Sequence, residues 1–225
     1  MGHHRAHHAG RRPQVAPGLL LAAALLAGGC RRHEPGARDS GPVLERVREG
    51  DIVFQKWWSL QGETVELATS SRYSHVGIVI VEGGTPLVLE AGQLVKRMPL
   101  AEWIERGVGR HVVVKRLRDA DSVLTPEVLK RMRAVGNSFL GRGPDLAFAW
   151  DDKRLYSAEL VFKVYKRGAG VQIGRLQKLG DFDLSDPLVQ SKLREKYGAD
   201  IPIDTPVVSP QSIFDDEKLV TVVEQ

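Results

Sequence analysis

The sequence predicts an α+β fold, in which an antiparallel sheet packs against helices. Short runs rich in Val and Ile, closed by glycine or proline, recur along the chain with isolated helical patterns between them. These strands lie before, between and after the helices without strict alternation, which argues against a βαβ fold. The 225 residues, of which 42% are hydrophobic, suffice for one domain with its own core.

The first half of the domain is expected to be rich in strands. Residues 75–80 form a β-branched run that ends at Gly83-Gly84, and a second apolar run follows at 86–91, so this stretch predicts a β-hairpin. A short helix at 99–107 should place Trp103 on its apolar side. The other elements expected here are strands over 52–55, 93–98 and 111–117, and helices over 43–48 and 60–69.

The second half is expected to contain more helix. Thr125 is a capping residue, Pro126 suits the first helical position and Glu127 adds an acid to the first turn, so a helix should run from here to about Leu140. The other elements expected here are helices over 158–166 and 184–197, strands over 172–176 and 219–223, a loop over 141–144 and proline-rich turns before the last strand.

The N-terminal residues resemble a bacterial lipoprotein signal. An apolar segment at 15–27, too short to span a bilayer, leads into Leu26-Ala27-Gly28-Gly29-Cys30. The resemblance implies cleavage before Cys30 and lipid attachment to its sulfur; the alternative is an ordinary secretory signal with a chance cysteine. The expected organisation is a signal peptide over 1–29, a lipidated tether over 30–41 and a folded domain over 42–225.

Charge and cysteine content exclude several classes of protein. Arg5, Arg11 and Arg12 of the leader account for all but one of the four excess positive charges, so the basic balance gives no reason to expect a nucleic-acid partner. Cys30 is the single cysteine, which excludes an internal disulfide and a CxxC motif. With no HExxH, phosphate-binding glycine loop or carboxylate cluster, neither a metal nor another cofactor is expected.

His75 and Ser157 are the candidates for catalytic chemistry. His75 begins a strand, where it can reach a cleft at the end of the sheet; the alternative is a structural strand histidine. Ser157 lies at a predicted helix start, where free N–H groups and the helix dipole stabilise an oxyanion. Its alternative role is a helix N-cap, for which serine is preferred. His33 in the tether and His111 at another strand are expected not to take part.

Four segments together resemble the YiiX/YebB-like hydrolases, which are circularly permuted relatives of the papain-like NlpC-type enzymes. These segments are residues 50–54, 73–78, 89–91 and 156–161. The resemblance implies a permuted papain-like fold in which the histidine strand precedes the nucleophile helix. It also implies that His75 is the general base and that Glu90 orients its imidazole, where the alternative is an exposed strand carboxylate. Tyr156 matches the tyrosine beside the nucleophile. This tyrosine either helps to hold the oxyanion or only packs against its neighbours.

The resemblance further implies a cysteine where this chain has Ser157 and a serine where it has Ala158. A cysteine beside histidine at a helix N-terminus becomes a thiolate near neutral pH, whereas a serine must lose its proton to His75 during attack. Two functions are therefore expected. One is a membrane-anchored lipoprotein of the bacterial envelope that cuts an amide bond in a peptidoglycan peptide or an N-acyl compound, or transfers the acyl group. The other is an inactive binding module of the same fold that holds peptidoglycan peptide or lipid.

Overall fold

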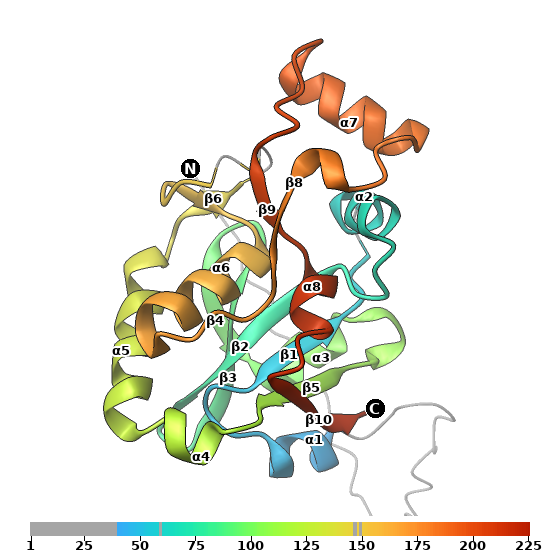
Figure 1. The fold of residues 1–225 in the computed structure, drawn as a ribbon. Helices are drawn as coiled ribbons and strands as arrows, with labels where there is room; N and C mark the ends of the chain where they lie inside the picture. Colours follow the sequence, from blue (N-terminus) through green and yellow to red (C-terminus); the bar gives the residue numbers. More distant parts are fainter. Residues whose placement is uncertain (1–39, 59, 146–147, 149) are drawn as a thin grey trace, which may run out of the picture. The chain divides into compact units, whose positions relative to one another are not determined.

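The structure is a computed structural model that describes residues 40–58, 60–145, 148 and 150–225 (Figure 1). The expected signal peptide and Cys30 lie outside these residues. Within them, no helix has both the length and the apolar character needed to cross a membrane.

A six-stranded antiparallel sheet, in the order β10-β5-β1-β2-β3-β4, forms the centre of the domain. The hairpin is confirmed: Glu82 pairs with Thr85, and Gly83 and Gly84 between them have the positive φ angles of a tight two-residue turn. The expected strands of this sheet are confirmed, with ends that shift by at most two residues. They are β1 (Ile52–Gln55), β2 (His75–Glu82), β3 (Thr85–Ala91), β4 (Val95–Pro99), β5 (Val113–Leu117) and β10 (Leu219–Glu224).

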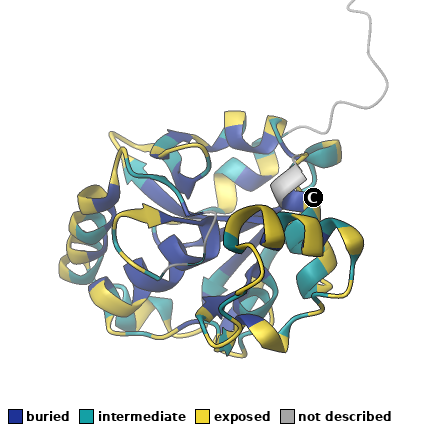
Figure 2. Ribbon diagram, turned by 90° about the horizontal axis from the view of Figure 1, so that it is seen from above, coloured by how far each residue is buried: buried dark blue, intermediate teal, exposed yellow. Residues whose placement is uncertain are grey.

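Both faces of the sheet are buried, because alternate side chains of the central strands enter different cores. Ile52 and Phe54 of β1 join the cluster built with α6 (Ser157–Val164) and α5 (Pro126–Phe139). Val53 between them joins the cluster built with α1 (Gly41–Arg46) and α3 (Leu100–Glu105). Figure 2 shows this arrangement as dark blue strands flanked by helices whose outer turns are yellow.

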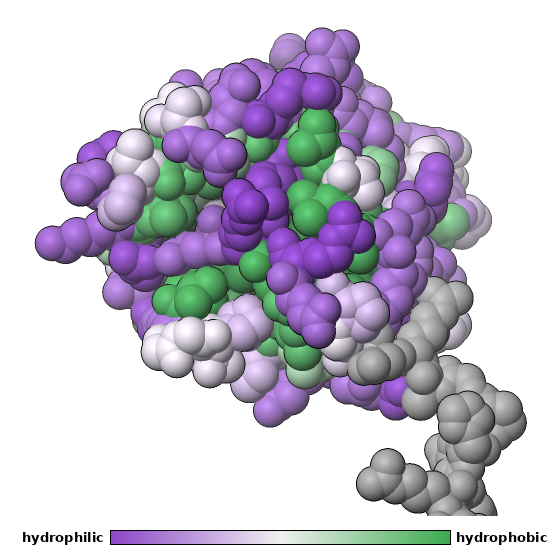
Figure 3. Space-filling model, turned by 90° about the horizontal axis from the view of Figure 1, so that it is seen from below, coloured by the Kyte–Doolittle hydropathy of each residue, from purple (hydrophilic) through white to green (hydrophobic). Residues whose placement is uncertain are grey.

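Viewed from below, the surface of the domain carries hydrophobic patches separated by hydrophilic side chains (Figure 3).

The remaining elements extend the domain beyond the sheet. The helices are α2 (Leu60–Thr69), α4 (Ala120–Val123), α7 (Pro187–Tyr197) and α8 (Pro210–Phe214), with 3-10 turns at Val108–Arg110 and Leu179–Asp181 and a π-helical turn at Tyr165–Ala169. Two small sheets pair β6 (Gly143–Pro144) with β7 (Arg154–Leu155) and β8 (Leu176–Lys178) with β9 (Pro206–Val208).

The expected strand over 172–176 is wrong for all but its last residue. Gly174 has a positive φ and donates its amide to Asp216 at 2.7 Å, so the chain turns here and β8 begins only at Leu176. The expected helix over 184–197 starts later, because Asp186 caps α7 by accepting hydrogen bonds from the first-turn amides and Pro187 takes its first position.

Candidate active site

His75 and Glu90 form a buried pair on the hairpin. His75 Nε2 lies 2.7 Å from Glu90 Oε2. In the β2–β3 register Gly77 is opposite Glu90, so His75 and Glu90 are diagonal neighbours whose side chains share one face. The pairing leaves the other ring nitrogen, Nδ1, as the one that can face a nucleophile. The structure therefore brings together two of the residues that the sequence singled out.

Three further side chains surround the Glu90 carboxylate. Trp103 Nε1 and Arg106 Nη1 each donate to it at 3.0 Å, and Lys96 Nζ lies 3.8 Å away. Burial raises the pKa of Glu90, but the hydrogen bond and charge of His75, together with Arg106, outweigh burial and lower this pKa to about 2. Glu90 is thus ionised at neutral pH. The alternative of an exposed strand carboxylate is wrong, because Glu90 is 0% exposed.

Two tryptophan rings confine the imidazole of His75. The Trp57 ring centroid lies 4.6 Å from that of His75, and the Trp103 ring is nearly parallel to it at 6.0 Å. Arg106 lies 4.7 Å above Trp57 and also holds Glu90, so one cation braces both neighbours of the histidine. This packing restricts rotation of the imidazole. The sequence indicates it only through the adjacent pair Trp57 and Trp58, of which Trp58 is exposed.

Ser157 is the first residue of α6, and the N-cap of this helix is Tyr156. The alternative of an N-cap role for Ser157 is therefore wrong. Glu159 Oε2 accepts a hydrogen bond from the Tyr156 amide at 3.4 Å and so supports the helix start. Ser157 is 8% exposed and lines the same cavity as His75, although among the described residues its hydroxyl makes no hydrogen bond with that imidazole.

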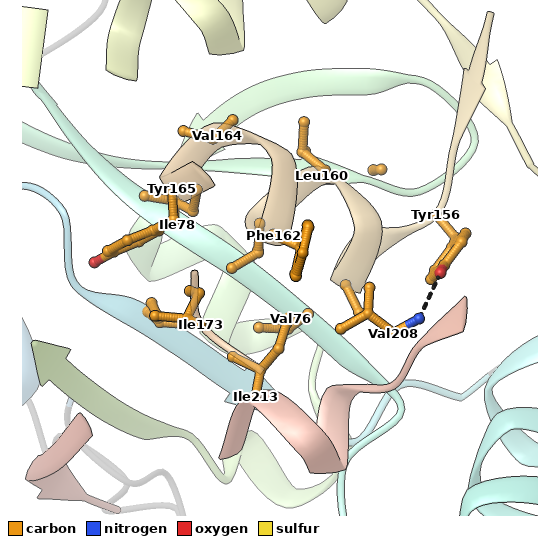
Figure 4. Close-up of a cluster of buried hydrophobic side chains, with 14 of the residues drawn as sticks. Val76, Ile78, Tyr156, Leu160, Phe162, Val164, Tyr165, Ile173, Val208 and Ile213 are labelled. Atoms are coloured by element: carbon orange, nitrogen blue, oxygen red, sulfur yellow. Dashed lines mark hydrogen bonds between the residues drawn. The ribbon is translucent and has the colours of Figure 1, made fainter. Parts of the chain in front are cut away.

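Tyr156 anchors the start of α6 to a distant strand. Its hydroxyl accepts a hydrogen bond from the Val208 amide of β9 at 3.0 Å (Figure 4). Burial raises the pKa of this phenol well above its usual value, so the hydroxyl stays protonated. Through this hydrogen bond Tyr156 positions the start of α6, where Ser157 lies. A direct role of Tyr156 at an oxyanion stays a prediction.

The two candidate catalytic residues line a single cavity of about 580 Å³. His75 and Ser157 lie in its wall beside Trp57 and Tyr156. His111 is not part of this wall; its Nδ1 lies 2.7 Å from the Gln225 carbonyl, which fits the structural role expected for it. Among the residues that the structure describes, no group of three or more His, Cys, Asp or Glu side chains could hold a metal ion.

The fold and this arrangement agree with a family match. The family described as "Permuted papain-like amidase enzyme, YaeF/YiiX, C92 family" matches residues 46–223. The chain belongs to this family. Its members include hydrolases of amide bonds, and the permuted papain-like α+β fold expected from the sequence is confirmed.

Two relatives are similar over most of their length. The uncharacterized protein YiiX of Escherichia coli strain K12 is 42% identical over 176 residues, which cover 78% of this chain and 86% of that protein. A crystal structure described as the metalloprotein yiiX from Escherichia coli O157:H7 has a TM-score of 0.75 and 41% identity, and covers 80% of this chain and 98% of its own. The resemblance to YiiX-like hydrolases is therefore confirmed.

Proposed function

We propose that this member of the permuted papain-like amidase family hydrolyses an amide bond with Ser157 as nucleophile and His75 as general base. The observation that carries the proposal is that His75, which pairs with the buried Glu90, lines one cavity with a serine at the N-terminus of α6. Nucleophilic hydrolysis needs a base that is held by an ionised carboxylate on one side and can reach a helix-terminal hydroxyl on the other.

The chemistry follows from this arrangement. Ser157 Oγ attacks the carbonyl carbon of the substrate while His75 Nδ1 takes its proton, and the imidazolium then gives that proton to the leaving amine. Glu90 stabilises the imidazolium through Nε2. Free N–H groups in the first turn of α6 stabilise the oxyanion. A water molecule, deprotonated by His75, releases the acyl group from Ser157 and restores the serine.

No metal enters this mechanism. The solved relative is described as a metalloprotein, but the described residues of this chain lack a group of three ligands, and the His75 nitrogen next to Glu90 is already occupied by that carboxylate.

A serine-directed fluorophosphonate tests the proposal without knowledge of the substrate. The full chain in detergent should be labelled at Ser157, and Ser157→Ala should abolish labelling. His75→Ala should abolish it as well, because the hydroxyl needs the base; labelling that survives His75→Ala contradicts the assignment. In parallel, turnover of amide substrates by Ser157→Cys but not by the unmodified chain would favour the binding module, since the remaining machinery would then be intact.

The N-terminal signal supports a second part of the proposal, that the protein is an envelope lipoprotein anchored through Cys30. Cys30 is the single cysteine and follows Ala27-Gly28-Gly29. Bacterial cells that express the chain should incorporate an alkyne-tagged fatty acid into it, and Cys30→Ser should remove the tag and release the protein from membranes. Equal tagging of both forms would contradict lipidation at this cysteine.

A further inference from the structure

Arg106 lies directly after α3, at a point where the backbone is tied to the end of β1. It is the C-cap residue of α3. The next residue, Gly107, forms an antiparallel bridge with Trp57, and the Val108 amide donates a hydrogen bond to the Lys56 carbonyl at 3.0 Å. The backbone that carries the Arg106 side chain is therefore fixed by the helix on one side and by the sheet on the other.

This segment supplies one donor to each oxygen of the Glu90 carboxylate. Trp103 Nε1 donates to Oε2, and three residues later, on the same side of the chain, Arg106 Nη1 donates to Oε1, both at 3.0 Å. His75 Nε2 lies 2.7 Å from the oxygen that Trp103 also contacts. One carboxylate oxygen thus faces the imidazole and the other faces the guanidinium, so the carboxylate cannot rotate without losing hydrogen bonds.

The guanidinium of Arg106 is held from several sides but is not buried. The same nitrogen donates to Met98 Sδ at 3.0 Å, and the group lies 4.7 Å from the centre of the Trp57 ring. The Arg106 side chain is 32% exposed, whereas that of Glu90 is 1% exposed. Arg106 therefore keeps part of its hydration, while the buried charge of Glu90 depends on its neighbours.

A cation other than the imidazole is needed beside Glu90 for a reason of charge. A general base has to be neutral before it can take a proton. When His75 is neutral, Glu90 is a buried carboxylate that still needs a positive partner, because an unpaired buried charge is strongly unfavourable. Besides His75, the described cations within 4 Å of Glu90 are Arg106 and Lys96, and Lys96 is 49% exposed and 3.8 Å away.

We propose that Arg106 is a positioning residue that allows His75 to rest as a neutral base. The proposal rests on the proposed function and adds a residue to the same site. Without Arg106, the imidazole would be the nearest cation for Glu90, so it would keep its proton at neutral pH and could not accept one from Ser157. The other charged residues that line the cavity all come from α7 and are half-buried or exposed; they are Lys192, Glu195 and Lys196.

A titration of the His75 ring tests the proposal without any substrate. The full chain in detergent, labelled with ¹⁵N at histidine, is titrated by NMR, and His75→Ala identifies the resonances of this ring. Arg106→Gln removes the second cation, so the pH at which the imidazole loses its proton should rise by about one unit or more. A midpoint that does not move overturns the proposal.

Two further variants separate charge from packing. Lys96→Gln removes the other cation near the same oxygen and should move the midpoint by less than about half a unit, because Lys96 is more distant and more exposed. Arg106→Lys keeps the charge and should restore most of the original midpoint. Equal shifts in Lys96→Gln and Arg106→Gln, or no restoration by lysine, would contradict the role given to the Arg106 charge. If Arg106→Gln fails to fold, Arg106→Met removes the charge and can still pack on Trp57.

In the proposed reaction, Arg106→Gln should also leave a signature that a loss of structure does not produce. Fluorophosphonate labelling of Ser157 should slow by about five- to ten-fold at pH 6, because less of the imidazole is neutral there, and should recover as pH rises past the new midpoint. Slow labelling that does not recover at high pH would overturn the proposal.

The titration and the labelling of the unmodified chain distinguish failure of this proposal from failure of the proposed function. Labelling of the unmodified chain at Ser157, with the same midpoint in Arg106→Gln, would overturn the role of Arg106 alone. A raised midpoint in Arg106→Gln without labelling of the unmodified chain would overturn the amidase alone and leave Arg106 as the residue that sets the charge of His75.

Discussion

Glu90 and Glu159 are both 0% exposed, yet their surroundings give them opposite acidities. The partners of Glu90, His75 and Arg106, lower its pKa to about 2. Burial is the largest influence on Glu159 and raises its pKa to about 7, although Lys163 lies 2.6 Å away and acts in the other direction. Burial alone therefore does not decide the charge of a carboxyl group in this protein.

The difference lies in how the cations are shared. Glu90 pairs with His75 and accepts hydrogen bonds from Trp103 and Arg106, and among the described residues none of these three forms an ion pair with another carboxylate. Lys163 is divided between Glu159, the carboxylate of Asp152 and the Asp151 carbonyl, and the charge of Asp145 also raises the pKa of Glu159. We therefore expect Glu90 to act in catalysis and Glu159 to act in stability, and this contrast can be tested.

The largest expected effect is on activity at Glu90. Glu90→Gln keeps the shape of the side chain but removes the charge that, in the proposed mechanism, stabilises the His75 imidazolium. We expect kcat to fall by about 10³–10⁴-fold with little change in KM, as when the carboxylate of a catalytic triad is made neutral. Steady-state kinetics on an N-acyl amide would measure this. A loss of less than about ten-fold in kcat would show that Glu90 only packs.

The next effect is on stability at Lys163. At about pH 9, where Glu159 is ionised because its pKa is about 7, Lys163→Ala leaves this charge buried without its cation, so the free energy of unfolding should fall by about 3–5 kcal/mol. Arg167→Ala is the matched control, because Arg167 pairs with Asp152 on the surface and should contribute within about 1 kcal/mol. Urea denaturation would compare the two variants, and similar losses in both would remove the contrast between the buried and the surface pair.

The smallest effect is a dependence of stability on pH. Because the pKa of Glu159 is about 7 in the folded chain against 4.5 as the ordinary value, the folded state binds this proton more tightly than the unfolded state. The contribution is fully present below about pH 4.5 and is lost as pH rises through about 7, by up to about 3 kcal/mol. Glu159→Gln should abolish this slope in denaturation measured across that range. An unchanged slope would place the titrating group elsewhere.

Much of the sheet could be predicted because its signals are local. The glycine pair at 83–84 fixes the hairpin, and hairpin register then places Glu90 beside His75. The start of α6 was also predictable, although the cap proved to be Tyr156, whose amide is supported by Glu159 in the next turn. Neighbours in sequence or across one hairpin leave such signals.

The donors to Glu90 and the lining of the cavity at Ser157 could not be predicted in this way. Trp103 follows an apolar pattern in α3, and that pattern says nothing of the indole N–H that reaches a carboxylate. The cavity joins α2 to segments more than a hundred residues later, and β9 begins at Pro206 in a proline-rich stretch that predicts only turns. Contacts between distant segments depend on packing, which no local pattern encodes.

The bond between Tyr156 and Val208 links β9, which forms part of the cavity wall, to the start of α6. β9 supplies the cavity wall with Val207 and, one residue later, the amide that fixes the residue before Ser157. A shift of this strand would therefore reach the start of α6 through Tyr156. In the proposed mechanism, a substrate that moves β9 also moves Ser157 relative to His75, which couples binding to reaction as induced fit does.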